Sequence, residues 1–186
     1  LHYITLFNNK MNTFIDTFKI NELKISQFFN KIVSKNYLLH HILKFITAAG
    51  EWWMYLIYAI FSLIFLNPIV ALHLIKIGTI AFCFHYPIYY VIKNSTKRRR
   101  PCDKSANIIA LVKPPDKYSM PSGHSSGTTI IALTLIHTFP NYNILLFIPI
   151  LVALSRFMLG VHYISDTIVG MFLGYCCFNI SLYLIG

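Results

Sequence analysis

The sequence predicts an all-α membrane protein: a polytopic membrane helix bundle of about five to six transmembrane helices with an amphipathic N-terminal helix. Three observations support this fold class. Hydrophobic residues make up 56% of the 186 residues, and charged residues only 12%, whereas a soluble domain carries about a quarter charged residues. The mean hydropathy is +0.59. Apolar runs long enough to cross a bilayer core of about 30 Å alternate with shorter polar segments.

The net charge of +10, from 16 Lys and Arg against 6 Asp and Glu, points to an anionic partner. Such a balance is typical of proteins that bind nucleic acid, an anionic membrane surface or an anionic substrate. The apolar composition disfavours nucleic acid, so we expect the partners to be the bilayer and an anionic lipid. The four cysteines form no C-x-x-C pair and no metal-ligand spacing. The oligomeric state stays open.

Residues 1–45 are the first expected unit, an amphipathic N-terminal segment. Between residues 10 and 46, apolar side chains such as Phe18 alternate with lysines such as Lys24 and Lys31 at roughly helical spacing. This pattern is typical of a helix that lies at a membrane surface. A poorly ordered leader is the alternative interpretation.

Residues 46–186 are the second expected unit, a transmembrane domain. A span needs about 20 apolar residues, and turns or polar segments separate the apolar runs here. Asn67-Pro68 marks one turn, and a second turn begins at Pro140. Residues 93–121 are polar, basic and Pro-containing, so they are expected to form a long loop. The predicted spans are residues 46–66, 69–92, 122–139, 144–160 and 164–185.

Counting the crossings places three polar clusters at one membrane face. Both ends of the long loop lie on the same side, and residues 156–166 return to that side after two further crossings. The start of the first span, near Glu51, lies there too, and we expect Glu51 to cap that helix or to contact a polar headgroup. The three clusters run from Lys93 to Pro101, from Pro121 to His124 and from Ser155 to Asp166.

The clusters have the chemistry of a phosphate-binding site. Arg100 and Arg156 each present a planar fork of donors that matches phosphate oxygens, and Lys93 adds a compact charge. Ser122 and Gly123 lie where a helix is expected to begin. Free backbone N–H groups at such a helix start favour an anion.

His162 and Asp166 are four residues apart, so a helix would place them on one face, within hydrogen-bonding reach. An acid that fixes the tautomer of a histidine is the arrangement used in nucleophilic catalysis. A structural ion pair is the alternative for these two residues. Gly160 is expected to allow a close helix approach. For Lys97, Arg98 and Arg99, a positive anchor at the membrane surface is at least as good an interpretation as a role in the site.

The pattern K-x6-R-P, then P-S-G-H, then S-R-x5-H-x3-D resembles that of the type 2 phosphatidic acid phosphatases (PAP2). The resemblance covers roughly residues 50–185, and the three-part match is highly specific, whereas any single part would be weak. The family usually has six spans, and this chain shows five plus the N-terminal segment. The signature positions are Lys93, Arg100, Pro101, Pro121, Ser122, Gly123, His124, Ser155, Arg156, His162 and Asp166.

The resemblance implies a role for each candidate site residue. His162 would attack phosphorus and carry a phosphohistidine intermediate, and Asp166 would orient and activate it. His124 would protonate the leaving oxygen and then activate water. Members of the family need no metal, so the resemblance implies an enzyme without a metal or cofactor. The residues expected to hold the phosphoryl oxygens are Lys93, Arg100, Ser122, Gly123 and Arg156.

The resemblance therefore implies a membrane phosphatase acting on a lipid phosphate or diphosphate. Undecaprenyl diphosphate is the expected substrate, with phosphatidylglycerol phosphate, phosphatidic acid and lipid A phosphate as alternatives. A protein that binds or moves an anionic lipid without hydrolysing it is the alternative from another class. Vanadate-dependent halide oxidation is disfavoured, because the related proteins that perform it are soluble.

The resemblance also implies a bacterial inner membrane with the active site facing the periplasm. The positive-inside rule points the other way, because it would place the basic segment 93–117 in the cytoplasm. Lys93 and Arg100 are placed for chemistry, which weakens that rule here, and we expect the periplasmic face.

Overall fold

The computed structural model describes the backbone of residues 2–186 and the side chains of residues 11, 13 and 16–186. The described chain is helical and contains no strand, which confirms the all-α class. Its elements are α1 (His2–Lys35), α2 (Tyr37–Ala48), α3 (Trp52–Phe65), α4 (Pro68–Thr96), α5 (Pro101–Lys104), α6 (Gly123–Thr138), the 3₁₀ helix η1 (Asn143–Leu146), α7 (Phe147–Met158) and α8 (Ile164–Ile185).

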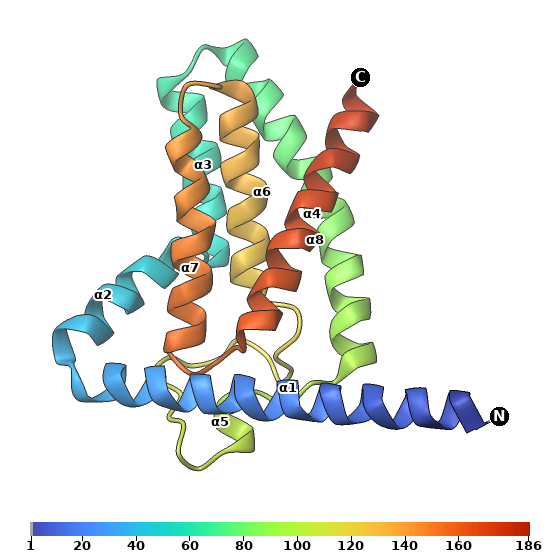
Figure 1. The fold of residues 1–186 in the computed structure, drawn as a ribbon. Helices are drawn as coiled ribbons and strands as arrows, with labels where there is room; N and C mark the ends of the chain where they lie inside the picture. The colour runs from blue at the N-terminus through green and yellow to red at the C-terminus, as the bar shows by residue number, and fades with distance from the viewer. Residues whose placement is uncertain (1) are drawn as a thin grey trace.

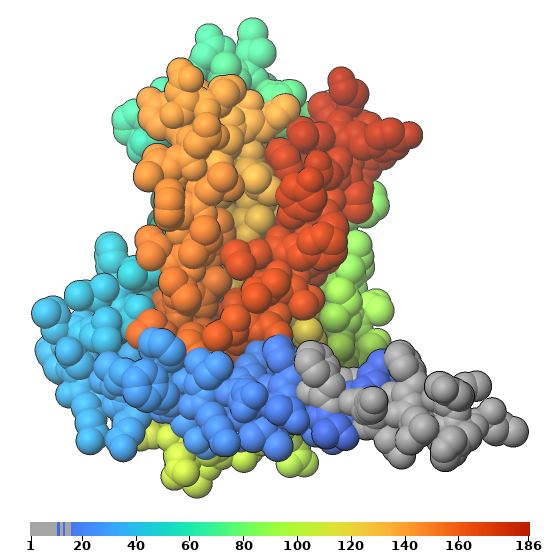
Figure 2. Space-filling model, viewed as in Figure 1, coloured from blue at the N-terminus to red at the C-terminus, as the bar shows by residue number. Residues whose placement is uncertain are grey.

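The helices α3, α4, α6, α7 and α8 form an upright bundle, and α1 lies across one end of it (Figure 1). α6 is central and packs against α4, α7 and α8. The end that α1 covers also holds the α4–α6 loop and the turn between α7 and α8 (Figure 1). Figure 2 shows α1, in blue, running below α7 and α8, with the loop beneath it. The expected convergence of these segments at one end is therefore seen in the fold.

The surface of the bundle suits lipid. Among the described residues, Pro68–Lys104 and Ile164–Ile185 are long and apolar enough to cross a membrane, and α2 with α3 adds a third if the bent pair is one span. Large apolar side chains point outward from the bundle, including Phe65, Leu72 and Phe172. Such a surface is stable against hydrocarbon and not against water. The chain is thus a membrane helix bundle.

The segment predicted as a span over residues 46–66 is not one continuous helix. α2 ends at Ala48, α3 begins at Trp52, and their axes are bent by 58°. The break at Gly50 lies against α6, where a Cβ on Gly50 would be 2.9 Å from Cβ of His124. The expected boundary between residues 45 and 46 also falls inside α2. Tertiary contact with His124, which no local pattern reveals, sets the position of the bend.

Hydroxyl residues make α6 polar although it lies at the centre of the bundle. Thr128 donates to the carbonyl of His124 at 2.7 Å, and Thr129 donates to that of Ser125 at 2.7 Å. Because each hydroxyl bonds within its own helix, it can be buried without an unpaired donor. This explains how α6 can be buried although it is rich in hydroxyl side chains.

Two glycines let α8 pack closely on α6. A Cβ on Gly170 would lie 2.5 Å from the carbonyl oxygen of Ser122, and a Cβ on Gly174 would overlap that of Ser126. Small residues four apart allow this kind of backbone approach in membrane helices. The starts of the two helices are joined, since the N–H of Ser122 donates to the carbonyl of Asp166 at 3.0 Å.

The α1 helix turns a polar stripe toward the protein. Glu22, Ser26 and Asn30 are buried, whereas Phe18 and Phe28 are exposed. The Asn30 amide donates to the carbonyl of Ile109 at 2.9 Å and accepts from the N–H of Ile109 at 2.8 Å. The α1 helix is thus bonded to the α4–α6 loop and leaves apolar side chains outward.

Gly160 forms a tight turn and also allows the close helix approach expected from the sequence, here to α1. Its φ is 81°, a left-handed conformation that favours glycine. A Cβ there would be 2.7 Å from both Nδ2 of Asn30 and the carbonyl oxygen of Ile109. The turn that carries His162 is therefore tight and closely covered by α1 and the loop.

Candidate active site

Three cations predicted to bind phosphate are buried at the end of the bundle that α1 covers. Lys93 lies in the last turn of α4, Arg100 precedes α5, and Arg156 lies in the last turn of α7. Their charges act together on His162, which stands in the turn between α7 and α8. The structure therefore brings residues from three distant segments into one site.

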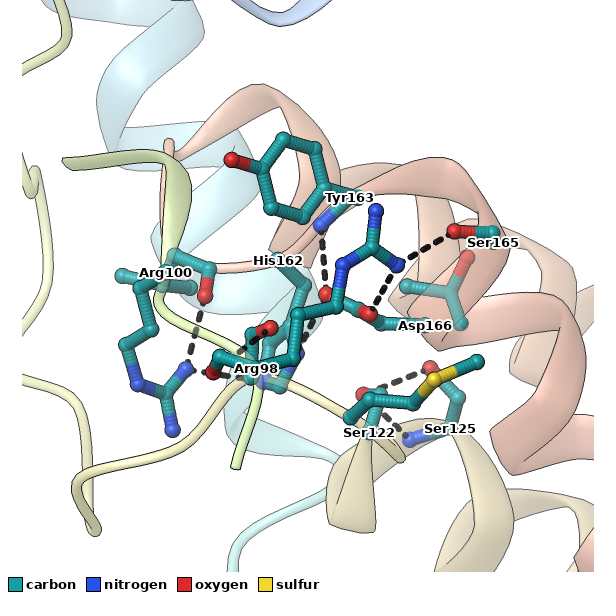
Figure 3. A network of polar contacts seen from close by, with 12 residues as sticks. Arg98, Arg100, Ser122, Ser125, His162, Tyr163, Ser165 and Asp166 are labelled. Atoms are coloured by element: carbon teal, nitrogen blue, oxygen red, sulfur yellow. Dashed lines mark hydrogen bonds and ion pairs between the residues drawn. The ribbon is translucent and has the colours of Figure 1, made fainter. Parts of the chain in front are cut away.

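The two ring nitrogens of His162 face different partners. Nη1 of Arg100 lies 3.1 Å from Nε2 of His162 and donates to the carbonyl of Val161 at 2.7 Å (Figure 3). Because a guanidinium only donates, Nε2 is the acceptor and the ring proton sits on Nδ1. Burial lowers the pKa of His162 well below its usual value, and the charges of Arg100 and Arg156 lower it further. The imidazole is therefore neutral at neutral pH.

Asp166 lies beside Nδ1 of His162, but not as two positions on one helical face. His162 precedes α8, and Oδ2 of Asp166 stands 3.7 Å from Nδ1, beyond hydrogen-bonding distance. Oδ2 instead accepts from the N–H of Tyr163 at 2.8 Å, which caps the start of α8. The cap at the start of α8 therefore brings His162 and Asp166 together. The prediction that both lie on one face of a helix is wrong.

Asp116 bridges two of the cations. Nζ of Lys93 lies 2.5 Å from one carboxylate oxygen and Nη2 of Arg100 2.5 Å from the other. The hydroxyl of Tyr89 also donates to Asp116, at 2.7 Å. Burial raises the pKa of Asp116, but Lys93, Tyr89 and Arg100 together outweigh burial and hold this pKa below its usual range. A carboxylate therefore occupies donors that the sequence assigns to phosphate.

Arg156 keeps free donors. Its Nη1 donates to the hydroxyl of Thr47 at 3.3 Å, while Nε and Nη2 are buried and meet no acceptor among the described residues. Buried donors without acceptors are unfavourable, and a bound anion would satisfy them.

His124 and Ser122 stand at the start of α6. Ser122 is the N-cap, and its hydroxyl accepts from that of Ser125 at 2.9 Å. His124 follows Gly123, and its Nε2 lies 3.3 Å from Oε1 of Glu51. Glu51 makes no side-chain cap to α3. The expected helix start at Ser122 and Gly123 is confirmed, whereas Glu51 contacts a histidine and does not cap.

Arg98 belongs to this site and is not only a surface anchor. Its guanidinium lies 2.6 Å from Oδ1 of Asp166 (Figure 3). It also lies 2.5 Å from Oε2 of Glu22 and stacks on the ring of Tyr163 at 4.1 Å. No sequence motif predicted a role for Glu22 or Asp116. One signal was available: the chain has only 6 acidic residues, and acids in such an apolar protein are functional candidates.

Known proteins share sequence patterns and the fold with this chain. A sequence model of the PAP2 superfamily matches residues 52–186. Decaprenylphosphoryl-5-phosphoribose phosphatase of Mycobacterium tuberculosis is 40% identical over 97 residues, which are 52% of each chain. The protein of that name from Mycolicibacterium smegmatis is 36% identical over 96 residues, 52% of this chain and 51% of its own. The chain thus spans about half the length of the curated relatives it matches.

Two crystal structures share the fold. Aquifex aeolicus LpxE superposes with a TM-score of 0.73 at 24% identity, covering 87% of this chain and 94% of its own. A PAP2-type phosphatidylglycerolphosphate phosphatase from Bacillus subtilis gives a TM-score of 0.66 at 22% identity, covering 87% and 84%. At these identities the likeness concerns the fold.

Proposed function

The chain belongs to the PAP2 superfamily, and from this premise we propose that it hydrolyses a lipid phosphate or diphosphate through a phosphohistidine intermediate on His162. The observation that carries the proposal is the setting of His162. Its unprotonated Nε2 faces buried cations, and its Nδ1 faces the carboxylate of Asp166. A nucleophile, an orienting acid and a cationic cradle are the parts that phosphoryl transfer needs.

In the first step, Nε2 of His162 attacks phosphorus and the P–O bond to the lipid breaks. His124 gives its proton to the leaving oxygen. Charge spreads over the equatorial phosphoryl oxygens in the transition state, and fixed cations there lower the barrier. The cations are Lys93, Arg100 and Arg156, with Ser122 and Gly123 adding donors at the start of α6.

In the second step, water attacks the phosphorus of the phosphohistidine and gives its proton to His124. The N–P bond breaks, inorganic phosphate leaves, and His162 is neutral again. Asp166 opposes the positive charge that the imidazole carries as an intermediate, and its 3.7 Å separation from Nδ1 is expected to shorten then. The protein's own cations neutralise the phosphoryl group, so we propose that the reaction needs no metal.

An apolar cavity supports a lipid substrate. It measures about 580 Å³, lies between α3, α4 and α6, and is lined by apolar side chains and by Tyr55. The hydroxyl of Tyr55 donates to the carbonyl of Gly50 at 3.1 Å, and Gly50 packs against His124. A lipid tail in this cavity would therefore place its phosphate end beside His124, the acid that protonates the leaving oxygen of the lipid.

We infer that the substrate is a polyprenyl phosphate or diphosphate. Undecaprenyl diphosphate is the substrate expected from the sequence, and the relatives named above act on decaprenylphosphoryl-5-phosphoribose. We further propose that residues 1–45 form an N-terminal unit and that the chain crosses the membrane five times, with each span ending where its helix ends. We also propose that the protein lies in a bacterial inner membrane and that its site faces the periplasm. The alternatives among lipids are phosphatidylglycerol phosphate, phosphatidic acid and lipid A phosphate.

The test is phosphate release by the purified protein in detergent with EDTA present, run on each of these lipids. The variants are His162→Ala and, as a matched control, His137→Ala at the other end of α6, where the side chain is exposed. We expect release by the wild type and by His137→Ala, and a loss of at least about 10⁴-fold in His162→Ala. Acid-labile phosphate should appear on the wild-type protein during turnover.

Three outcomes would contradict the proposal in whole or in part. Equal release by His162→Ala would exclude this nucleophile. No release from any lipid, with equal lipid binding by both proteins, would favour a non-hydrolytic binder. Loss of release in EDTA, restored by a metal ion, would contradict the metal-independent step alone.

A further inference from the structure

The guanidinium of Arg98 lies between two buried carboxylates from opposite ends of the chain. Nη1 stands 2.6 Å from Oδ1 of Asp166, and Nη2 stands 2.5 Å from Oε2 of Glu22. Nη1 also donates to the hydroxyl of Ser165 at 2.6 Å (Figure 3). The ring of Tyr163 supports the other face of the guanidinium at 4.1 Å. Arg98 is therefore held on several sides, and Asp166 is one of its partners.

Glu22 uses both carboxylate oxygens. Oε2 accepts from Arg98, and Oε1 accepts from the N–H of Ser165 at 2.8 Å. That N–H belongs to the first turn of α8, which has no acceptor within its own helix. Glu22 is only 4% exposed. One carboxylate on α1 thus binds both the arginine that contacts Asp166 and the helix start that carries Asp166.

Packing alone does not account for this residue. Burying a carboxylate costs solvation free energy, and an apolar side chain of similar size would seat α1 more cheaply. An amide would also fail to replace it, because its oxygen can face only one of the two donors while its NH₂ would face the other.

The charges explain what Glu22 adds. Arg98 carries one positive charge against two negative ones, so the three side chains retain a net negative charge beside His162. The other charged or titratable groups that act on His162 favour its neutral form: Arg100, Arg156, Lys93 and His124. Without Glu22, Arg98 would neutralise Asp166, and nothing else in this group would oppose the positive charge of a phosphorylated imidazole.

We propose that Glu22 of α1 is a positioning residue for Asp166, acting through Arg98 and the start of α8, so that the N-terminal helix supplies a part of the catalytic apparatus. The inference rests on the proposed function, because Asp166 matters only if His162 is the nucleophile. It also gives the N-terminal helix a role outside residues 52–186, which the family pattern matches.

The test compares Glu22→Gln with Asp16→Asn, which removes an exposed acid from the same helix. For Glu22→Gln we expect kcat to fall about 10- to 100-fold, with KM within about twofold of the wild type. The acid limb of kcat/KM should move to lower pH, because losing a negative charge near His162 disfavours its protonation. Asp16→Asn should leave rate and pH profile unchanged.

Two further variants distinguish the loss of the Glu22 charge, and of its action through Arg98, from a simple folding defect. Glu22→Asp keeps the charge but reaches fewer donors, so it should lower kcat and keep the acid limb at the wild-type pH. Arg98→Gln should lower kcat, and adding Glu22→Gln to it should cost little more, because both changes interrupt one route. Detergent-purified variants are compared at equal folded fraction, measured by thermal unfolding.

The outcomes distinguish this inference from the proposed function. An active wild type with an equally active Glu22→Gln variant would overturn the inference and leave the phosphatase intact. Fully additive effects of Glu22→Gln and Arg98→Gln would overturn the route through Arg98. An inactive wild type would overturn the proposed function and the inference with it.

Discussion

At the scale of single residues, the site is a set of opposed charges around one neutral ring. Four of the 6 acidic residues contact a cation or histidine of the site: Glu22, Glu51, Asp116 and Asp166. Only Asp166 was predicted to act there. The signature motifs gave the cations and both histidines, because these residues recur at fixed spacing. The other acids reach the site across more than a dozen residues of chain, and no local pattern reveals such contacts.

The neutral state of His162 predicts a pH profile. Burial and the neighbouring cations lower the pKa of His162 well below 6.5, and the nucleophile is the unprotonated ring. The acid limb that His162 gives to kcat/KM should therefore lie well below pH 6.5. Arg100→Gln removes a cation, which raises the pKa of His162 and should move the limb to higher pH.

The control is Arg99→Gln, an exposed arginine beside Arg100 whose charge is screened by solvent. Arg99→Gln should leave the acid limb of kcat/KM at the wild-type pH. A limb that stays fixed in Arg100→Gln would show that Arg100 does not set the protonation of His162. Both variants are measured as kcat/KM against pH on the same lipid.

The carboxylate of Asp116 predicts the affinity of the site for anions. Because Asp116 engages Lys93 and Arg100 at 2.5 Å each, an entering phosphate must compete with it. Asp116→Asn should lower the inhibition constants of phosphate and orthovanadate by about 10-fold, equivalent to about 1.4 kcal/mol. Inhibition assays measure this directly.

Asp103→Asn is the matched control, since Asp103 is an exposed acid on α5 in the same loop. Its inhibition constants should equal those of the wild type. Weaker inhibition in Asp116→Asn would mean that this carboxylate organises the cations for phosphate and does not compete with it.

At the scale of elements, helix starts position the chemistry. α6 begins at the P-S-G-H motif and α8 begins just after His162, and a backbone hydrogen bond of 3.0 Å joins the two starts. The apolar runs predicted helices in all five expected spans. They did not predict the bend between α2 and α3 or the cap that pairs His162 with Asp166, because both depend on contacts with other helices.

The close contact between α6 and α8 predicts a difference between two glycines. Gly170→Ala places a methyl group 2.5 Å from the carbonyl oxygen of Ser122, so it should destabilise the protein by about 1–3 kcal/mol and lower activity. Gly78→Ala on α4 meets nothing within 4 Å and should be neutral or slightly stabilising, because alanine favours helix.

Thermal unfolding in detergent measures both variants, with phosphate release as the second reading. Equal melting temperatures for Gly170→Ala and the wild type would show that α8 can shift without cost. Reduced activity at unchanged stability would place the effect in the site alone.

At the scale of the whole molecule, the α4–α6 loop and the α7–α8 turn, which carry candidate site residues, lie at one end of the bundle, and the α3–α4 and α6–α7 connections lie at the other (Figure 1). Cys102 stands at the site end, while Cys83, Cys176 and Cys177 lie within the bundle helices. The molecule therefore carries a cysteine that reports which side of the membrane the site faces.

If the site faces the periplasm, a membrane-impermeant maleimide should label Cys102 in intact spheroplasts. Cys102→Ser should abolish that labelling, because the other cysteines are in helices expected to lie in lipid. Labelling of Cys102 only after the membrane is opened would place the site in the cytoplasm and uphold the positive-inside rule.

The bridge that Asp116 makes between Lys93 and Arg100 also bears on how a catalytic cycle closes. Product phosphate leaves a cradle whose like charges would otherwise repel one another across a buried space. With a carboxylate at hand, departure becomes an exchange of one anion for another, and the repulsion between Lys93 and Arg100 stays offset. Turnover then ends with the cations already paired, poised for the next headgroup to displace the same side chain.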